Sequence, residues 1–386
     1  MKIIRKINIK NVGVKIFIII ICYLGLERLK LNFIISISPL NDMLNLEAYF
    51  KLCNTSNMND FFSFKRKFSP KISIISPIYN RGEFLLRFLK SIQKQNFNDI
   101  EIILIDDFSS DNTVSLIKKY KSIDQRIVLI KNKKNFGTFK SRNLGILKSS
   151  GEYLILPDPD DILSQDSLKI FYVFATKYNY ELLRFNLYIG WNKIFFSDCA
   201  NPTPSRPVKI PEIKTFLFYA SHKLRQIDFN VSNKFVKREA LIRALNILSK
   251  EYLNMYMTNF EDGILNYMLY RTSNSFYFLK KIGYYYIRNK HSVSINGFKS
   301  ETIKFIFIHL KIVFEFSRNT IYEKNMFNAL FKRLVIRKSI IKRLKLMKAD
   351  LKFYIDNIDK FLASEFVSIK NKMYLTQLKK RLIKIL

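Results

Sequence analysis

Residues 71–80, Lys-Ile-Ser-Ile-Ile-Ser-Pro-Ile-Tyr-Asn, begin the part of the sequence that decides the fold. A short β-branched run that ends near Pro77 is typical of a buried strand. An alternating series follows, with helices expected near 83–95, 113–121 and 138–147 and strands at 100–105, 127–130 and 153–156. Strands that alternate with helices of ~10–15 residues predict βαβ units, and so a mostly parallel α/β sheet flanked by helices.

Two acidic loops directly follow predicted strands. Residues 106–113 read Asp-Asp-Phe-Ser-Ser-Asp-Asn-Thr, and residues 158–161 read Asp-Pro-Asp-Asp. In open sheets of this kind, ligands bind at the carboxyl ends of the strands. Packed carboxylates repel one another unless a cation lies between them, and Mg²⁺-type ions use one or two carboxylates together with substrate phosphates. The alternative for Asp111 and Asp161 is that each caps the helix that follows it.

The overall composition limits the kind of site. The 386 residues hold 66 Lys and Arg against 31 Asp and Glu, which gives a net charge of +35. This excess suggests a polyanionic partner, but it is mostly lysine, as an AT-biased coding sequence would also produce. The three cysteines and three histidines are dispersed, which excludes a disulfide framework, a cysteine zinc site and a histidine cluster. Any metal is therefore expected on carboxylates, which favours a hard cation such as Mg²⁺ or Mn²⁺.

Four motifs in a fixed order resemble the family 2 glycosyltransferases, which have the GT-A (Rossmann-like) fold. They are residues 71–80, the segment Ile-Leu-Ile-Asp-Asp-Phe-Ser-Ser-Asp-Asn-Thr up to Thr113, the segment Asn135-Phe-Gly-Thr-Phe-Lys-Ser-Arg-Asn-Leu-Gly145, and 158–161. A weaker resemblance continues through Asn233-Lys234, Glu261-Asp262 and Tyr284-Tyr285-Tyr286. The resemblance implies a catalytic domain over residues 69–300.

The two flanking regions lie outside that resemblance. Residues 1–68 hold basic residues, an apolar run at 16–26 and a polar linker. The run is short of the ~20 residues that span a bilayer, so it is either a signal or anchor, or an ordinary apolar segment. As an anchor it predicts membrane association, at the ER, Golgi or plasma membrane, and otherwise a cytoplasmic protein. Residues 301–386 have a helical pattern and 20 Lys and Arg against 7 Asp and Glu, which predicts a basic helical extension.

The resemblance also implies roles for individual residues. The nucleotide-sugar is expected to contact the turn with Pro77, Tyr79 and Asn80, the pair Asp106 and Asp107, and the basic residue Arg142, with Asp158 towards the ribose. Asp160, with Asp158, matches the metal-binding Asp-x-Asp (DXD) motif for Mn²⁺ or Mg²⁺. Glu261 and Asp262 match the acidic motif from which inverting members draw their general base. The alternative for Asp262 is a helix cap or an ordinary surface carboxylate.

Together these features predict a metal-dependent, inverting glycosyltransferase. It would move a sugar from a nucleotide-diphosphate donor, with a UDP-sugar favoured, to a hydroxyl of a glycan, protein or lipid acceptor. One base and no covalent nucleophile predicts inversion. The alternatives are a catalytically inactive relative that serves as a scaffold, and a basic protein that docks on nucleic acid or on an anionic membrane through residues 301–386. Nucleic acid is a less favoured partner because the acidic loops would repel a polyanion.

Overall fold

The computed structural model describes residues 70–191, 194–197, 208–209, 230–288, 300–316, 327–328, 351–364, 367 and 369–383. The predicted signal or anchor at 16–26 and its linker lie outside these residues. The chain divides into two units, Met1–Ile37 and Ser38–Leu386, and everything described belongs to the second. Within the described part, no helix is both long enough and apolar enough to cross a bilayer.

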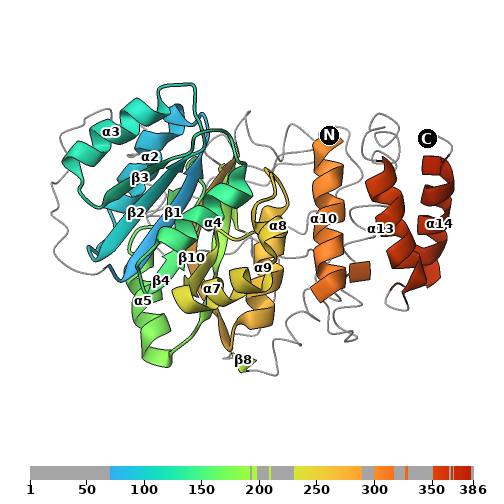
Figure 1. Cartoon of the computed structure of the whole chain (residues 1–386). Helices are drawn as coiled ribbons and strands as arrows, with labels where there is room; N and C mark the ends of the chain where they lie inside the picture. Colours follow the sequence, from blue (N-terminus) through green and yellow to red (C-terminus); the bar gives the residue numbers. More distant parts are fainter. Residues whose placement is uncertain are drawn as a thin grey trace, which may run out of the picture. The chain divides into compact units, whose positions relative to one another are not determined.

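The first half of the sheet is built from the predicted βαβ units (Figure 1). Its strands are β1 (Ile72–Ile78), β2 (Ile100–Asp106), β3 (Ile127–Lys131) and β4 (Tyr153–Ile155). They are parallel and lie in the order β3-β2-β1-β4. The connecting helices are α2 (Gly82–Gln93), α3 (Thr113–Ile123) and α4 (Thr138–Lys148). The alternation expected from the sequence is confirmed, with boundaries that differ by a few residues at most.

The second half of the sheet is mixed. It holds β5 (Ile162–Leu163), β6 (Leu182–Trp191), β7 (Ile194–Ser197), β8 (Val208–Lys209), β9 (Lys234–Lys237) and β10 (Ser275–Arg288). The complete order is β3-β2-β1-β4-β9-β6-β10-β5, with β7 on β6 and β8 on β10. Strand β9 is antiparallel to both of its neighbours, whereas β10 is parallel to β6. The helices of this half are α5 (Ser167–Tyr178), α7 (Arg238–Ile247), α8 (Lys250–Leu253) and α9 (Glu261–Thr272).

Both faces of the sheet are covered by helices, and this explains the continuous apolar runs of its strands. In β1, Ile72 and Ile74 pack with α2, α3 and α5, while Ile75 packs with α4, α7 and α9 on the opposite face. All seven residues of β1 are buried. The carboxyl ends of β1, β2 and β4 therefore reach one edge of a rigid, doubly covered layer.

Three helices represent the predicted basic extension in the described residues: α10 (Ser300–Phe316), α13 (Leu351–Ala363) and α14 (Ile369–Ile383). Helix α10 joins the main core through buried residues such as Phe307 and Leu310, which belong to the same apolar cluster as α7 and α9. The hydroxyl of Tyr267 on α9 donates to the Val313 carbonyl at 3.3 Å. The extension thus packs on the catalytic fold through α10.

Candidate active site

The loops after β1 and β2 are hydrogen-bonded to each other. Ile78 pairs with Asp106 in the parallel register, so both strands end at the same level. The Asn80 amide donates to Ser109 Oγ at 3.0 Å, and the Ser110 amide donates back to Asn80 Oδ1 at 2.9 Å. Asn80 has a left-handed φ of +49°, which asparagine tolerates better than most residues. The two loops form one preorganised surface.

The carboxylates of Asp106 and Asp107 lie beneath this surface and are both buried. Asp107 accepts hydrogen bonds from the side chain of Asn132 and from the amides of Phe136 and Gly137, each at 2.8 Å. Asp106 accepts from the Ser109 amide at 3.3 and 3.4 Å. Asp107 thus holds the loop after β3 in place, while Asp106 shapes its own turn.

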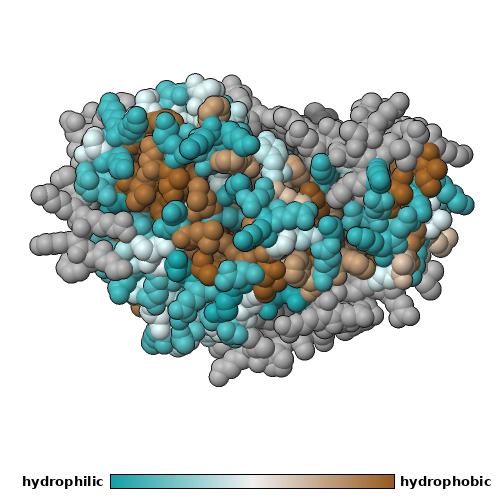
Figure 2. Space-filling view, in the orientation of Figure 1, coloured by the Kyte–Doolittle hydropathy of each residue, from teal (hydrophilic) through white to brown (hydrophobic). Residues whose placement is uncertain are grey.

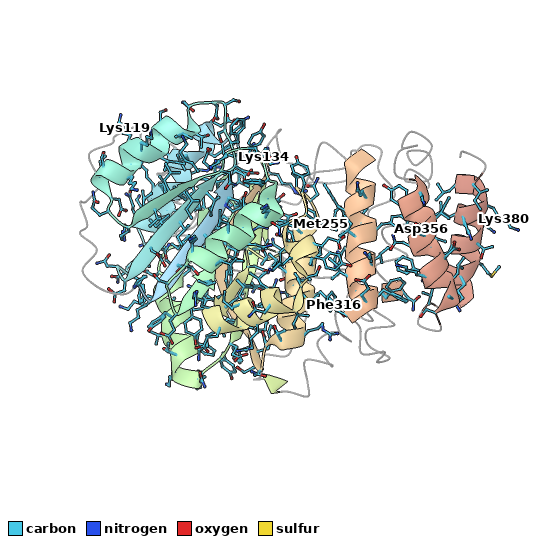
Figure 3. The ribbon with its side chains drawn as sticks, viewed as in Figure 1. Lys119, Lys134, Met255, Phe316, Asp356 and Lys380 are labelled. Carbon is cyan, nitrogen blue, oxygen red and sulfur yellow. The ribbon has the colours of Figure 1, made fainter. Side chains whose placement is uncertain are left out.

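The loop after β3 reaches across to the segment between α8 and α9. Figure 3 labels Lys134 in the first and Met255 in the second. The Phe139 amide donates to the Met257 carbonyl at 3.1 Å. Gly137 has a φ of +84°, and a Cβ there would lie 2.7 Å from the same carbonyl oxygen. This close approach positions α9, which carries the acidic pair, against α4.

Arg142 on α4 is the centre of a carboxylate cluster. Its side chain is 1% exposed, and Nη2 lies 3.0 Å from Asp158 Oδ1. Its Nη1 lies 3.1 Å from Glu261 Oε1 and 2.6 Å from Asp262 Oδ1. Burial alone would lower the pKa of Arg142, but Asp262, Glu261 and Asp158 raise it, so the guanidinium stays charged. One cation thus joins the loop after β4 to the first turn of α9.

The three aspartates of residues 158–161 have separate environments. Asp161 is fully buried: its Oδ2 accepts from the Tyr284 hydroxyl at 2.6 Å, and its Oδ1 from the Ile287 amide at 2.7 Å. The Asp158 amide donates to the same Tyr284 hydroxyl at 2.9 Å. Helix capping by Asp161 is therefore wrong, because its bonds go to β10. Asp111, in contrast, does accept from the Thr113 amide at the start of α3, at 3.0 Å.

Asp160 contacts two basic residues, Arg81 just before α2 and Arg87 within α2. Its Oδ2 is 3.9 Å from Arg81 Nε, and its carbonyl accepts from Arg87 Nη2 at 2.6 Å. Arg81 also donates to the carbonyl of Asn80 at 3.1 Å. Arg81 therefore connects the turn of 158–161 with the group made by Pro77, Tyr79, Asn80, Asp106 and Asp107. Pro77 itself is buried in β1, and Tyr79 is 47% exposed.

Electrostatics of the cluster favour an added cation. Burial raises the pKa of Asp158; Arg142 lowers it, and Asp262 and Asp160 raise it again. In the described residues, no group of three or more histidines, cysteines or acids is arranged to hold a metal by itself. Asp158 and Asp160 nevertheless offer hard oxygen donors on one turn. The donor set fits Mg²⁺ or Mn²⁺ that is completed by substrate phosphates, and does not fit a cage made by protein alone.

The acidic pair of α9 has one buried and one accessible member. Glu261 is 8% exposed and Asp262 25% exposed. Burial and the neighbouring Asp262 raise the pKa of Glu261, while Arg142 lowers it. Phe260 takes the position before the helix, with φ +64°, so Asp262 is not the cap but a first-turn residue bonded to Arg142. Asp262 is therefore the more solvent-accessible member of the pair.

No sequence motif marks the residues that position the 158–161 turn. Tyr284 is one of three successive tyrosines, and Arg81 and Arg87 belong to none of the four motifs. Tyr284 is fully buried on β10 and lies 123 positions from Asp161 in the sequence. No local pattern signals such a contact, because it depends on β10 pairing beside β5.

Comparisons with known proteins match this chain to glycosyltransferases. The family description "Glycosyl transferase family 2" matches residues 73–216. An uncharacterized glycosyltransferase, MG060, of Mycoplasma genitalium is 30% identical over 234 residues, which cover 58% of this chain and 72% of that protein. Glycosyltransferase GlyG of Streptococcus pneumoniae serotype 4 is 32% identical over 130 residues, but the match spans only 43% of GlyG.

Solved structures support the fold. Residues 1–349 of S. aureus TarS in complex with UDP match with a TM-score of 0.59 and 18% identity, over 82% of this chain and 88% of that one. The same TarS fragment has also been solved with UDP-GlcNAc. A likeness at this identity shows the fold, which is the GT-A architecture described above. The family match and the similarity to MG060 show that the chain belongs to glycosyltransferase family 2 and is a transferase.

Proposed function

We propose that this chain is a metal-dependent, inverting glycosyltransferase with a UDP-sugar donor. The observation that carries the proposal is the Arg142 cluster, which joins Asp158 of the Asp-x-Asp turn to the Glu261-Asp262 pair. One buried guanidinium thus binds Asp158, which we place beside the sugar donor, and the Glu261-Asp262 pair, which we place beside the sugar acceptor. That TarS has been solved with UDP and with UDP-GlcNAc supports a uridine donor here.

Asp262 is proposed as the general base. It would take the proton of the acceptor hydroxyl as that oxygen bonds to the anomeric carbon and the bond to the donor diphosphate breaks. Arg142 keeps Asp262 oriented through an ion pair of 2.6 Å between its Nη1 and Asp262 Oδ1. Attack from the face opposite the leaving diphosphate inverts the anomeric centre. A positioned base of this kind contributes about 10²–10⁴-fold to the rate.

Asp158 and Asp160 are proposed to hold the metal. When bound, Mn²⁺ or Mg²⁺ would neutralise the negative charge that develops on the leaving diphosphate. The protein's own contribution is to fix the turn: Tyr284 holds Asp161 and the Asp158 amide, and Arg87 holds the Asp160 carbonyl. The inactive-scaffold alternative is disfavoured, because each carboxylate that the reaction needs is present.

Calorimetric titration of the full chain with UDP and GDP, with and without Mn²⁺, tests this proposal. We expect UDP binding that requires Mn²⁺ and that is abolished in Asp160→Asn. Asp356→Asn, an exposed acid on α13, is the matched control and should bind as the parent does. A GDP preference would change the donor but keep the enzyme. A folded parent that binds neither nucleotide in the presence of Mn²⁺ would refute the active transferase.

A separate observation favours a second role for α14. Lys370, Lys372, Lys379, Lys380 and Arg381 lie on this helix, which has no acidic residue. Met373, Tyr374 and Ile383 are exposed on it, and Figure 2 shows apolar residues at the surface over the α13–α14 pair. A helix that carries exposed Lys380 together with these exposed apolar residues suits an anionic membrane. We propose peripheral membrane association through α14, which is compatible with transferase activity.

A further inference from the structure

Five residues other than glycine have a left-handed φ in the described part of the chain. They are Asn80, Phe108, Asp166, Asn179 and Phe260, with φ between +49° and +71°. Asparagine and aspartate adopt this conformation more readily than other side chains, whereas a bulky residue there is an outlier. The left-handed conformation of the two phenylalanines therefore requires a structural or functional explanation. Outliers of this kind gather at functional sites, where surrounding structure enforces them.

Phe260 has a packing reason, and Phe108 does not. The ring of Phe260 lies against the apolar cluster that contains α7 and α9. Phe108 has the largest φ of the five, at +71°, and its side chain is 57% exposed. Glycine would adopt the same φ without steric cost. The aromatic side chain of Phe108 is thus exposed to water, although the left-handed backbone conformation at this position is unfavourable for phenylalanine.

The position of Phe108 relates it to the proposed donor site. It follows Asp106-Asp107 at the carboxyl end of β2, next to the end of β1, and ligands of such sheets bind at this edge. Tyr79, which follows β1, is the other exposed aromatic here. The register of β1 and β2 places the two rings on adjacent chain ends.

The loop that carries Phe108 is held on both sides. Behind it, the Asp107 amide donates to the Ile78 carbonyl at 2.8 Å; ahead of it, Ser109 bonds Asp106 and Asn80. The ring is therefore presented by a fixed backbone, so that little conformational entropy is lost when a flat ligand covers it.

We propose that Phe108 is a donor-binding residue whose ring stacks on the nucleobase of the sugar nucleotide, beside Tyr79. This inference rests on the proposed function. Stacking on an aromatic ring is tolerant of base identity, since every base has a π-face. Phe108 therefore supplies affinity, and the choice of base is left to hydrogen-bonding groups of the same loops.

Titrations of three variants test the proposal on the full chain with Mn²⁺. Phe108→Gly and Phe108→Leu remove the aromatic face, and each should weaken UDP binding about ten-fold. Phe108→Tyr keeps the face and should bind UDP as the parent does. Binding of inorganic pyrophosphate, which has no base, should be the same in all four proteins. In turnover assays, Phe108→Gly should raise KM for the donor and leave kcat unchanged.

Thermal melts separate this role from a structural one. Phe108→Gly should melt no lower than the parent, because glycine relieves the left-handed strain. Asn179→Gly, at the end of α5, is the control for a glycine placed at positive φ, and should leave UDP binding unchanged. Equal UDP affinity in the parent, Phe108→Gly and Phe108→Leu would overturn the stacking role alone. A parent without UDP affinity would overturn the proposed function and this inference together.

Discussion

At the scale of single residues, the main finding is that one arginine holds three carboxylates. The sequence predicted the positions of Arg142, Asp158, Glu261 and Asp262, and the structure brings these four together. Three carboxylates share one guanidinium, and burial together with their mutual repulsion raises the pKa of Asp158 and of Glu261. A substrate-bound cation beside Asp158 would relieve this repulsion.

Asp262→Asn should separate chemistry from binding. Asparagine keeps the shape of the side chain but cannot take the acceptor proton, so kcat should fall by about 10²–10⁴-fold. Mn²⁺-dependent UDP affinity, measured by calorimetry, should stay within a few-fold of the parent. A variant that retains parental turnover would exclude Asp262 as the base and direct attention to another acid.

Glu261→Gln should change how stability depends on pH. Burial and Asp262 raise the pKa of Glu261 from 4.5 to about 7. The folded state therefore binds the proton more tightly than the unfolded state, and the free energy of unfolding falls as pH rises from about 4.5 to 7. Glutamine imitates the protonated form and avoids this loss. Tm of the variant relative to the parent should increase across that window, by about 2–4 °C for each kcal/mol.

Thermal melts at pH 4.5, 6 and 8 give the comparison. A Tm difference between Glu261→Gln and the parent that is the same at all three values would show that Glu261 does not titrate in this window. Glu239→Gln, an exposed acid in the first turn of α7, is the control and should show no such trend.

At the scale of secondary-structure elements, β10 is the strand that supports the turn of residues 158–161, where we propose that the metal binds. The Tyr284 hydroxyl accepts a hydrogen bond from the Asp158 amide and donates one to the Asp161 carboxylate. Both ends of the 158–161 turn therefore depend on one hydroxyl. The element is distant in sequence, and it is placed by its pairing with β5 and β6.

Tyr284→Phe should therefore weaken metal-dependent binding. Loss of the hydroxyl leaves buried polar groups without their partner, at a cost of about 1–3 kcal/mol in stability. The freed turn should also reduce Mn²⁺-dependent UDP affinity about five-fold or more, a change that simple destabilisation of a still folded protein would not cause. Tyr153→Phe is the matched control, since its buried hydroxyl donates to the Tyr180 carbonyl at 3.1 Å and, within the described residues, bonds no group of the 158–161 turn. Equal UDP affinity in both variants would remove Tyr284 from the site.

Whether an element could be predicted depends on how far apart in the sequence its stabilising contacts lie. Strands β1 to β4 and helices α2 to α4 were predicted because each has its own periodicity and short connections. Strand β9 was not, because Lys234–Lys237 carries two lysines, and Lys234 is buried where its Nζ bonds Asn233 Oδ1 at 2.6 Å. Tertiary contacts hide such a strand from any local pattern. The roles of Tyr284 and Phe108 are of the same kind, since both depend on neighbours that only the fold supplies.

At the scale of the whole molecule, the basic extension offers a test of membrane association. Lys372→Glu combined with Lys380→Glu reverses two charges on α14; Figure 3 labels Lys380 there. Each lysine near an anionic surface contributes about 1 kcal/mol, so partitioning into vesicles with phosphatidylserine should fall more than ten-fold. The control is Lys118→Glu with Lys119→Glu, an equal change of charge on exposed residues of α3.

Sedimentation with vesicles of phosphatidylcholine alone, and with added salt, completes this test. Parent protein should bind the anionic vesicles only and should be released as salt screens the charges. Equal loss of binding in the α14 and α3 variants would show that the net charge of the chain acts without a defined surface.

The central position of β9 in the sheet limits where chimaeras of enzymes from this family are joined. The family match ends at residue 216, yet β9 supplies the hydrogen bonds between β4 and β6, in the interior of the sheet. A fragment cut at that boundary would expose two strand edges, which favours aggregation. A graft that keeps strands β1 to β6 therefore also needs to keep residues 230–288 from the same parent, so that β9 is inherited with the β4 and β6 strands that it joins.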